Sequence, residues 1–243
     1  MKYKHLFTIL VTVLTCLSMG VAAQNQVGTF SIKPMAGVNI SNFGNSTIDI
    51  YKSKVGFTAG AELEYGVNPW LGLSLGLAYS QQGAKIDGII SLFGTDDEGY
   101  NFRSSSVMNG KLNCNYLNLP IMANIYIPAV KGLALKAGVQ VGLLTGDKMD
   151  TSVTTYMIRV APTGENMAYL VEEVSSGYSY TVSQTDICKS VDFSIPVGLS
   201  YEFKNISLDA RYCFGLKKID KTEDPDNSRN RYLSITLGYR FHL

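Results

Sequence analysis

The chain has 243 residues, of which 46% are hydrophobic and 17% are charged, and its formal net charge at pH 7 is +1. This near-neutral balance excludes the strong basic field of a nucleic-acid-binding protein, so we expect no nucleic-acid partner. Beyond the N-terminal region, no stretch approaches the roughly 20 apolar residues of a membrane helix, which excludes a helical membrane protein but not a β-barrel.

The N-terminal region has the three parts of a secretory signal peptide. Lysines at positions 2 and 4 precede the apolar run Leu6–Leu17, and the small residues Val-Ala-Ala at positions 21–23 follow it. The pattern predicts a signal peptide over residues 1–23 and a mature domain over residues 24–243, a length that suits one β domain. Cys16 leaves a lipoprotein signal as the alternative, although Thr15 stands where such signals have Gly, Ala or Ser.

Eight segments then alternate apolar residues with small or polar ones, which is the period of a β-strand. They are Phe30–Ile40, Val55–Tyr65, Leu71–Gln82, Asn115–Ile127, Leu133–Leu144, Val191–Tyr201, Ile206–Phe214 and Tyr232–Leu243. Each is about as long as the 9–11 residues with which a strand crosses a membrane. The pattern predicts an all-β protein, an eight-stranded antiparallel up-and-down transmembrane β-barrel.

The connections between these segments alternate in length. The long ones are Ser41–Lys54, Gly83–Cys114, Thr145–Ser190 and Gly215–Arg231, and the short ones are Gly66–Trp70, Pro128–Gly132 and Glu202–Asn205. Bacterial outer-membrane barrels have short periplasmic turns and long external loops, so we expect both termini in the periplasm. Within the third long connection, Thr154–Val160 and Met167–Val174 are predicted to form a hairpin that extends the barrel wall outward.

Side-chain size indicates which face of the strands meets lipid. A soluble lipocalin-like barrel also has eight alternating strands, but its apolar residues point inward. Because the interior of an eight-stranded barrel is narrow, the Gly, Ser, Ala and Asn of this chain suit the lumen, and its Leu, Ile, Val and Phe suit lipid. Aromatic residues expected at the two membrane interfaces are Tyr65, Trp70, Tyr201, Tyr239 and Phe241 on the periplasmic side and Tyr79 and Phe214 on the outer side.

The same alternation predicts nine charged side chains in the lumen. They are Lys33, Lys136, Arg211 and Arg240, with Glu62, Glu64, Asp192, Glu202 and Asp209. Charges in a narrow interior are costly unless they are paired, so the near balance of signs favours a salt-bridged plug. The alternative is an ion path, in which one sign would be expected to dominate.

Short segments within these strands resemble the PorT family of outer-membrane proteins, in the outer membrane protein beta-barrel domain group. They are Gly37-Val38-Asn39-Ile40-Ser41, Tyr79-Ser80-Gln81-Gln82-Gly83, Tyr116-Leu117-Asn118-Leu119-Pro120 and Leu237-Gly238-Tyr239-Arg240-Phe241. The resemblance covers essentially all of residues 24–243. It implies an eight-stranded outer-membrane barrel and little about activity, although the member that names the family serves a protein secretion system linked to gliding.

Catalytic and metal-binding patterns are scarce. The mature chain has one histidine, His242, predicted to point into the lumen at the periplasmic rim, where a polar filler is favoured over a catalytic base. The acidic clusters Asp96-Asp97-Glu98 and Glu223-Asp224-Pro225-Asp226 leave Ca²⁺ binding open, against solvated loop tips. We find no phosphate-binding glycine loop and no Cys/His metal spacing, and we expect neither enzyme activity nor a cofactor.

Three cysteines follow the predicted leader: Cys114, Cys188 and Cys213. Their positions in the alternation place all three inward, with Cys114 and Cys188 at similar heights near the outer rim. If a disulfide forms in this exported protein, we expect it between Cys114 and Cys188, where it would tie the second long connection to the third. The alternative is three free, packed thiols.

These patterns favour a non-enzymatic, monomeric outer-membrane barrel with a closed lumen. Its expected partners are outer-membrane lipid and lipopolysaccharide, together with an unidentified protein or glycan at the external loops. One alternative is an accessory component of a secretion complex, as the PorT resemblance allows. The other is a narrow solute pore.

Overall fold

The computed structural model describes residues 27–44, 50–95, 101–160, 171–219, 221 and 228–243, so the predicted signal peptide and both acidic clusters lie outside it. Among these residues no helix has the length and hydropathy of a membrane span. The strands are β1 (Phe30–Gly44), β2 (Tyr51–Lys52), β3 (Lys54–Asn68), β4 (Leu71–Thr95), β5 (Asn101–Tyr126), β6 (Leu133–Val160), β7 (Val171–Gln184), β8 (Val191–Phe203), β9 (Ile206–Lys218), β10 (Arg229–Tyr239) and β11 (Phe241–His242).

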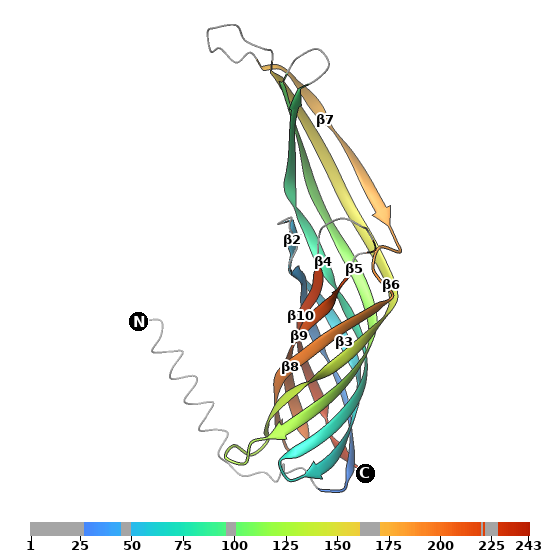
Figure 1. Ribbon diagram of the computed structural model, residues 1–243, viewed down its shortest axis with the longest axis vertical. Helices are drawn as coiled ribbons and strands as arrows, with labels where there is room; N and C mark the ends of the chain where they lie inside the picture. Colours follow the sequence, from blue (N-terminus) through green and yellow to red (C-terminus); the bar gives the residue numbers. More distant parts are fainter. Residues whose placement is uncertain (1–26, 45–49, 96–100, 161–170, 220, 222–227) are drawn as a thin grey trace, which may run out of the picture.

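Eight of these strands close into a ring (Figure 1). The order is β1, β3, β4, β5, β6, β8, β9 and β10, and each neighbouring pair is antiparallel. Pairing of β10 with β1 closes the ring, and β11 continues this ladder after Arg240. The predicted eight-stranded antiparallel barrel is therefore confirmed.

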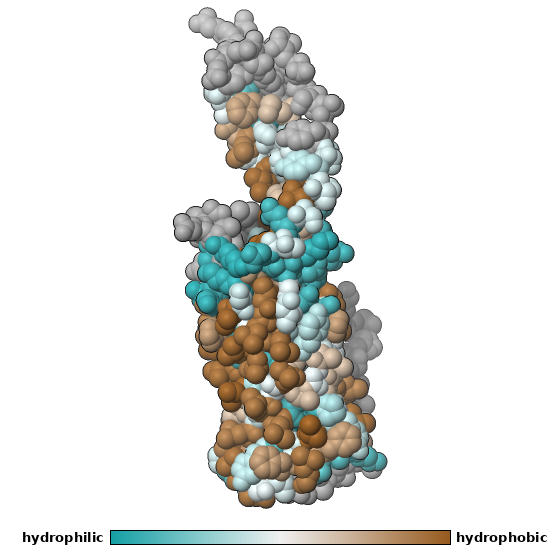
Figure 2. Space-filling view, turned by 90° about the vertical axis from the view of Figure 1, so that its right-hand side faces the viewer, coloured by the Kyte–Doolittle hydropathy of each residue, from teal (hydrophilic) through white to brown (hydrophobic). Residues whose placement is uncertain are grey.

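The predicted assignment of the two strand faces agrees with the burial of the side chains. On the outer wall Leu73, Leu75 and Leu77 of β4 are 49%, 53% and 50% exposed, whereas Glu62 and Asp209 inside the ring are 1% and 0% exposed. Apolar residues cover much of the barrel wall in Figure 2. A wall this apolar around a charged interior is the reverse of a lipocalin and suits a lipid environment.

Aromatic side chains mark both ends of the apolar wall. We name the end with the short connections at residues 69–70, 127–132 and 204–205 the turn end. Ring pairs lie there between Phe30 and Tyr65 (4.9 Å between centroids) and between Tyr239 and Phe241 (4.8 Å), and toward the other end between Phe57 and Tyr79 (5.4 Å) and between Tyr212 and Phe214 (4.5 Å). The predicted aromatic girdles thus lie at the two edges of the apolar wall.

Three ring strands, β4, β5 and β6, continue past the barrel wall, and β7 joins them in a sheet that projects from one side of the barrel (Figure 1). This projecting sheet consists of residues 84–95 of β4, 101–113 of β5, 147–160 of β6 and 171–184 of β7. The β4–β5 ladder runs to the pair Thr95 and Asn101, and the β5–β6 ladder to Asn101 and Val160. Among the described strands β7 pairs only with β6. We name this end of the molecule the sheet end.

The projecting sheet corrects the prediction of a long loop over Gly83–Cys114, most of which is strand. The expected hairpin in the third connection is confirmed in part, because Ile158 and Arg159 pair with Val174 and Glu173, while residues 167–170 lie outside the described part. Three consecutive serines at 104–106 and apolar residues on both faces of β4 hide the alternation there. The backbone hydrogen bonds between β4 and β5 that begin in the barrel nevertheless continue through these residues.

Glycines make room for the charged interior. An added Cβ at Gly76 would lie 2.8 Å from Cγ of Pro120 and 3.3 Å from Cγ of Glu62. One at Gly238 would lie 3.0 Å from Cγ of Lys33. The small residues that the sequence places inside the barrel thus leave the space that the long charged side chains occupy.

Candidate functional site

A first group of buried charges lies near the turn end of the lumen. Arg240, between β10 and β11, donates from Nε to Oε2 of Glu202 over 2.6 Å and from Nη2 to Oε2 of Glu64 over 3.2 Å. It also donates to Oγ of Ser31 over 2.8 Å, and Tyr126 donates its hydroxyl to Oε1 of Glu64. This lower cluster joins one cation to two carboxylates, so its formal charge is −1.

A second group of charges lies in the middle of the barrel. Its cations are Lys33 of β1, Lys136 of β6 and Arg211 of β9, and its carboxylates are Glu62 of β3 and Asp209 of β9. Glu62 lies 2.9 Å from Lys33, 2.9 Å from Lys136 and 2.6 Å from Arg211, and Asp209 lies 2.8 Å, 3.0 Å and 3.3 Å from the same three groups. This central cluster has three cations and two carboxylates, so its formal charge is +1.

The two clusters together are neutral and join strands from opposite sides of the ring. Eight of the nine predicted lumen charges belong to them. The ninth, Asp192 of β8, is buried in the lumen but forms no ion pair with the described residues. Since neither sign dominates and the charges bind each other, the arrangement suits a plug better than an ion path.

Uncharged polar side chains fill the next tier toward the sheet end. Gln140 donates to the hydroxyl of Tyr232 over 2.8 Å, and Asn118 donates to the same hydroxyl over 3.2 Å. Asn39 donates to Oγ of Ser80 over 2.8 Å. A void of about 30 Å³ remains between this tier and Arg211, enough for a water molecule but not for a solute path.

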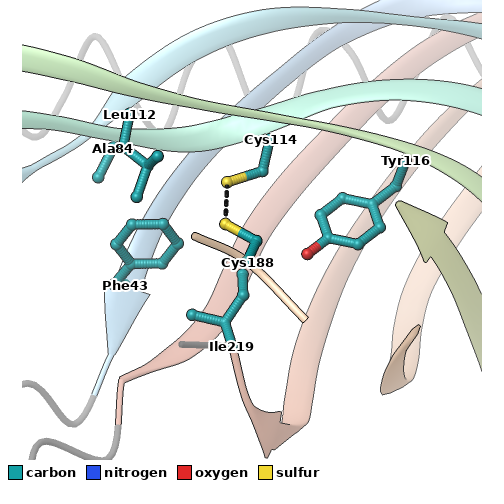
Figure 3. Close-up of a cluster of buried hydrophobic side chains, with 7 residues drawn as sticks. All are labelled: Phe43, Ala84, Leu112, Cys114, Tyr116, Cys188 and Ile219. Atoms are coloured by element: carbon teal, nitrogen blue, oxygen red, sulfur yellow. Dashed lines mark hydrogen bonds between the residues drawn. The ribbon is translucent and has the colours of Figure 1, made fainter. Parts of the chain in front are cut away.

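A cluster of apolar side chains, here named the apolar cap, closes the lumen at the sheet end (Figure 3). Its members are Phe43, Ala84, Leu112, Cys114, Tyr116, Cys188 and Ile219, none more than 6% exposed. Most of them lie in segments that the sequence analysis assigned to loops, so the cap was missed. The signal that could have found it is the inward series Ser80, Gln82, Ala84 and Ile86, which continues along β4 without interruption.

The link between β7 and β8 bonds to β6 and to the segment after β9, and it carries Cys188 into the cap. Oδ2 of Asp147 accepts hydrogen bonds from the amides of Ile187 and Cys188, both at 2.6 Å, and Oδ1 accepts one from Asp186 at 2.8 Å. Burial raises the pKa of Asp147, but these three amides lower it more, so the pKa lies below its ordinary value of 3.8. An ionised Asp147 therefore holds the link in place.

The three predicted inward cysteines are all buried, and two of them meet. Sγ of Cys114 and Sγ of Cys188 lie 2.8 Å apart without a bond between them, and Cys213 lies on β9 outside the cap. The predicted disulfide therefore remains a prediction, and the structure brings together the pair that it requires. His242 pairs in register with Ser31, which is buried in the lumen, and it is exposed at the turn end, in agreement with its predicted place at the rim of the lumen. The described residues contain no cluster of three His, Cys, Asp or Glu side chains that could hold a metal ion.

Replacing Glu62 tests the central cluster. Glu62→Gln would leave Asp209 alone among three buried cations, and we expect it to lower the free energy of unfolding by about 3–5 kcal/mol. The measurement is urea unfolding of the protein folded in lipid vesicles. Asp87→Asn, which removes an exposed carboxylate from β4, is the control and should have little effect. Equal losses in the two variants would refute a special role for the cluster.

Replacing Asp147 tests how the link is held. In Asp147→Asn we expect the amides of Asp186, Ile187 and Cys188 to exchange hydrogen about tenfold faster at pH 7, because each loses a charged acceptor. In the wild type the pKa is lowered, so the carboxylate's contribution is complete above about 3.8 and disappears as the pH falls through the lower value of the folded protein. Residue-resolved hydrogen exchange measures both effects. Asp150→Asn is the control, and faster exchange in that variant would contradict the assignment.

Several solved structures of bacterial surface and outer-membrane proteins are similar to this chain. The attachment invasion locus protein Ail of Yersinia pestis is 14% identical over 89% of this chain and 100% of its own, with a TM-score of 0.40. Neisserial surface protein A is 15% identical over 87% of this chain and 97% of its own, with a TM-score of 0.38. The outer membrane protease OmpT of Escherichia coli is 7% identical over 92% and 99%, with a TM-score of 0.29.

Most of the chain matches a known sequence family. No curated protein matches it. Residues 22–221, which include seven of the eight ring strands, match the family described as outer membrane protein beta-barrel domain. The closed antiparallel ring, its apolar wall and its buried ion pairs agree with this match. The chain therefore belongs to the outer membrane protein beta-barrel domain family.

Proposed function

We propose that this outer-membrane barrel is a non-enzymatic, monomeric surface protein that binds a protein or glycan through its projecting sheet. The observation that carries the proposal is the contrast between the two ends of the molecule. The lumen is filled by two ionic clusters, a polar tier and the apolar cap, whereas β4, β5 and β6 continue well beyond the barrel on one side, where β7 joins them (Figure 1). A closed barrel with a large projecting surface is built for contact, and not for transport.

The orientation in the membrane is part of this proposal. Short turns are the usual periplasmic feature of bacterial barrels, and long segments are the usual external one. The C-terminus lies at the turn end with the start of β1, so both would lie in the periplasm, from which an exported chain enters the membrane. The projecting sheet would then lie outside the cell.

The surface of the projecting sheet suits binding. Exposed apolar and aromatic side chains include Ile89, Leu92, Phe93, Tyr156 and Tyr180, of which Phe93 is 74% exposed. Serines and threonines lie between them. Aromatic contacts surrounded by adaptable hydroxyl groups are typical of binding surfaces. Catalysis has less support, because His242 lies at the opposite end and the two ionic clusters are enclosed by the barrel wall.

Photo-crosslinking in intact cells tests the proposed function. A photoreactive amino acid in place of Phe93 is expected to form adducts with a surface partner, while the same amino acid in place of Lys131 at the turn end is not. Adducts from Lys131 alone would contradict the proposal and favour an accessory role in a secretion complex, as in PorT.

The purified protein is also expected to show no steady conductance in planar bilayers, whereas steady conductance would favour the narrow-pore alternative.

A further inference from the structure

Three lysines form a row across neighbouring strands at the base of the projecting sheet. Lys52 of β2 pairs in register with Lys85 of β4, and Lys85 pairs with Lys111 of β5. All three are exposed. The next residue in register is Asp150, which forms an ion pair with Lys148 at 2.9 Å. We name Lys52, Lys85 and Lys111 the basic row.

The position of the basic row matches the boundary of a membrane. Along β4 the outward residues are Leu77, Tyr79, Gln81, Gly83 and Lys85. The basic row therefore lies beyond the apolar wall and its aromatic edge, after a short polar interval. Lys85 lies six positions after Tyr79, which is about 20 Å along a strand and less across a membrane, because barrel strands are tilted. Figure 2 shows a hydrophilic belt between the apolar wall and the projecting sheet.

Part of this arrangement is unfavourable. Like charges directly opposite each other on paired strands destabilise a sheet, and Lys85 and Lys111 lie opposite each other in this way. A multivalent anion beside the row would turn this repulsion into attraction. The apolar wall below the row would at the same time accept acyl chains, a combination that fits a phosphorylated glycolipid better than a free anion.

We propose that the basic row binds the phosphate groups of the glycolipid in the outer leaflet and so fixes the base of the projecting sheet to the membrane surface. This inference rests on the proposed function in one respect, because it places the sheet end at the outer leaflet. Lysine suits this role, since its ammonium group binds phosphate as a compact point charge at the end of a flexible side chain.

The test is binding of lipid A by the purified full-length protein in detergent, measured by native mass spectrometry. The variant Lys85→Gln/Lys111→Gln is compared with Lys131→Gln/Lys204→Gln, which removes two exposed lysines at the turn end. We expect the first variant to bind bisphosphorylated lipid A more weakly by about fivefold per lysine, and the second to bind like the wild type. Heat-modifiable gel migration verifies that both variants are folded.

Three results would overturn the proposal. They are unchanged binding in Lys85→Gln/Lys111→Gln, equal binding of lipid A from which both phosphates have been removed, and displacement of lipid A by an equal concentration of sodium phosphate, which would indicate a site for the free anion. The assay does not depend on surface display. Lipid A binding without crosslinking from Phe93 would therefore refute the proposed function and leave this inference standing.

A separate observation, the contact between Cys114 and Cys188, supports a second proposal. Their sulfurs lie 2.8 Å apart inside the apolar cap, although the two residues are 74 positions apart in the chain. We infer that they form a disulfide that fixes the link between β7 and β8 to β5. In this step the two thiols lose two protons and two electrons to the disulfide of an exported thioredoxin-like oxidoreductase, which becomes a dithiol.

The environment of the pair indicates when the bond would form. The hydrogen bond with Cys114 and burial raise the pKa of Cys188 in the folded protein, which suppresses the reactive thiolate. Both sulfurs are also closed off from a protein oxidant, since Cys114 is 0% exposed and Cys188 1%. Oxidation would therefore precede closure of the cap, and the finished bond would be shielded from external thiols.

Peptide-resolved alkylation in denaturant tests this second proposal. In protein purified from its native envelope, we expect Cys114 and Cys188 to be alkylated only after reduction and Cys213 to be alkylated with or without it. Cys188→Ser should lower the temperature of the gel-migration shift, whereas the control Cys213→Ser should not. Alkylation of all three cysteines without reductant, or equal shifts in the two variants, would overturn the proposal.

Discussion

The ion pairs between Glu62, Asp209 and the three cations around them are the interaction on which the barrel interior depends. The narrow interior of an eight-stranded ring buries every side chain that points inward. Burying an unpaired charge there costs a large desolvation free energy. Because each of the two carboxylates contacts all three cations, the central cluster couples β1, β3, β6 and β9 across the lumen. Its surplus positive charge is balanced by the lower cluster, in which Arg240 contacts two carboxylates.

Closure of the lumen determines where the molecule can act. Above the charges, hydrogen-bonded amides and hydroxyls give way to the apolar cap, and Asp147 of β6 holds the link between β7 and β8, which carries Cys188 into that cap. A solute would have to displace several tiers that differ in polarity. Contact with other molecules is left to the outer surfaces, which comprise the apolar wall, the basic row and the projecting sheet. Three strands, β4, β5 and β6, thus belong both to the apolar wall and to the projecting sheet.

The nine lumen charges could be predicted because a strand alternates its faces with period two, so each residue's side follows from its position. Which of these charges form pairs could not be predicted, because Glu62 and Lys136 are distant in the chain and meet only after the ring closes. Asp192 illustrates the limit, since the alternation placed it inside correctly but could not indicate that it lies apart from both clusters. The cap was missed for a similar reason, as its members come from five separate segments.

The sequence by itself determined the fold class, the number of ring strands, their inward and outward faces and the aromatic edges of the wall, because these depend on local periodicity and side-chain size. Only the tertiary structure decided how far the strands extend. Gly88, Gly94 and the serines at 104–106 give no clear alternation, yet a ladder already paired in the barrel carries them into the projecting sheet. The tertiary structure also decided which charges and which cysteines lie in contact. Those distances depend on strand register and ring closure, and neither is encoded within a single strand.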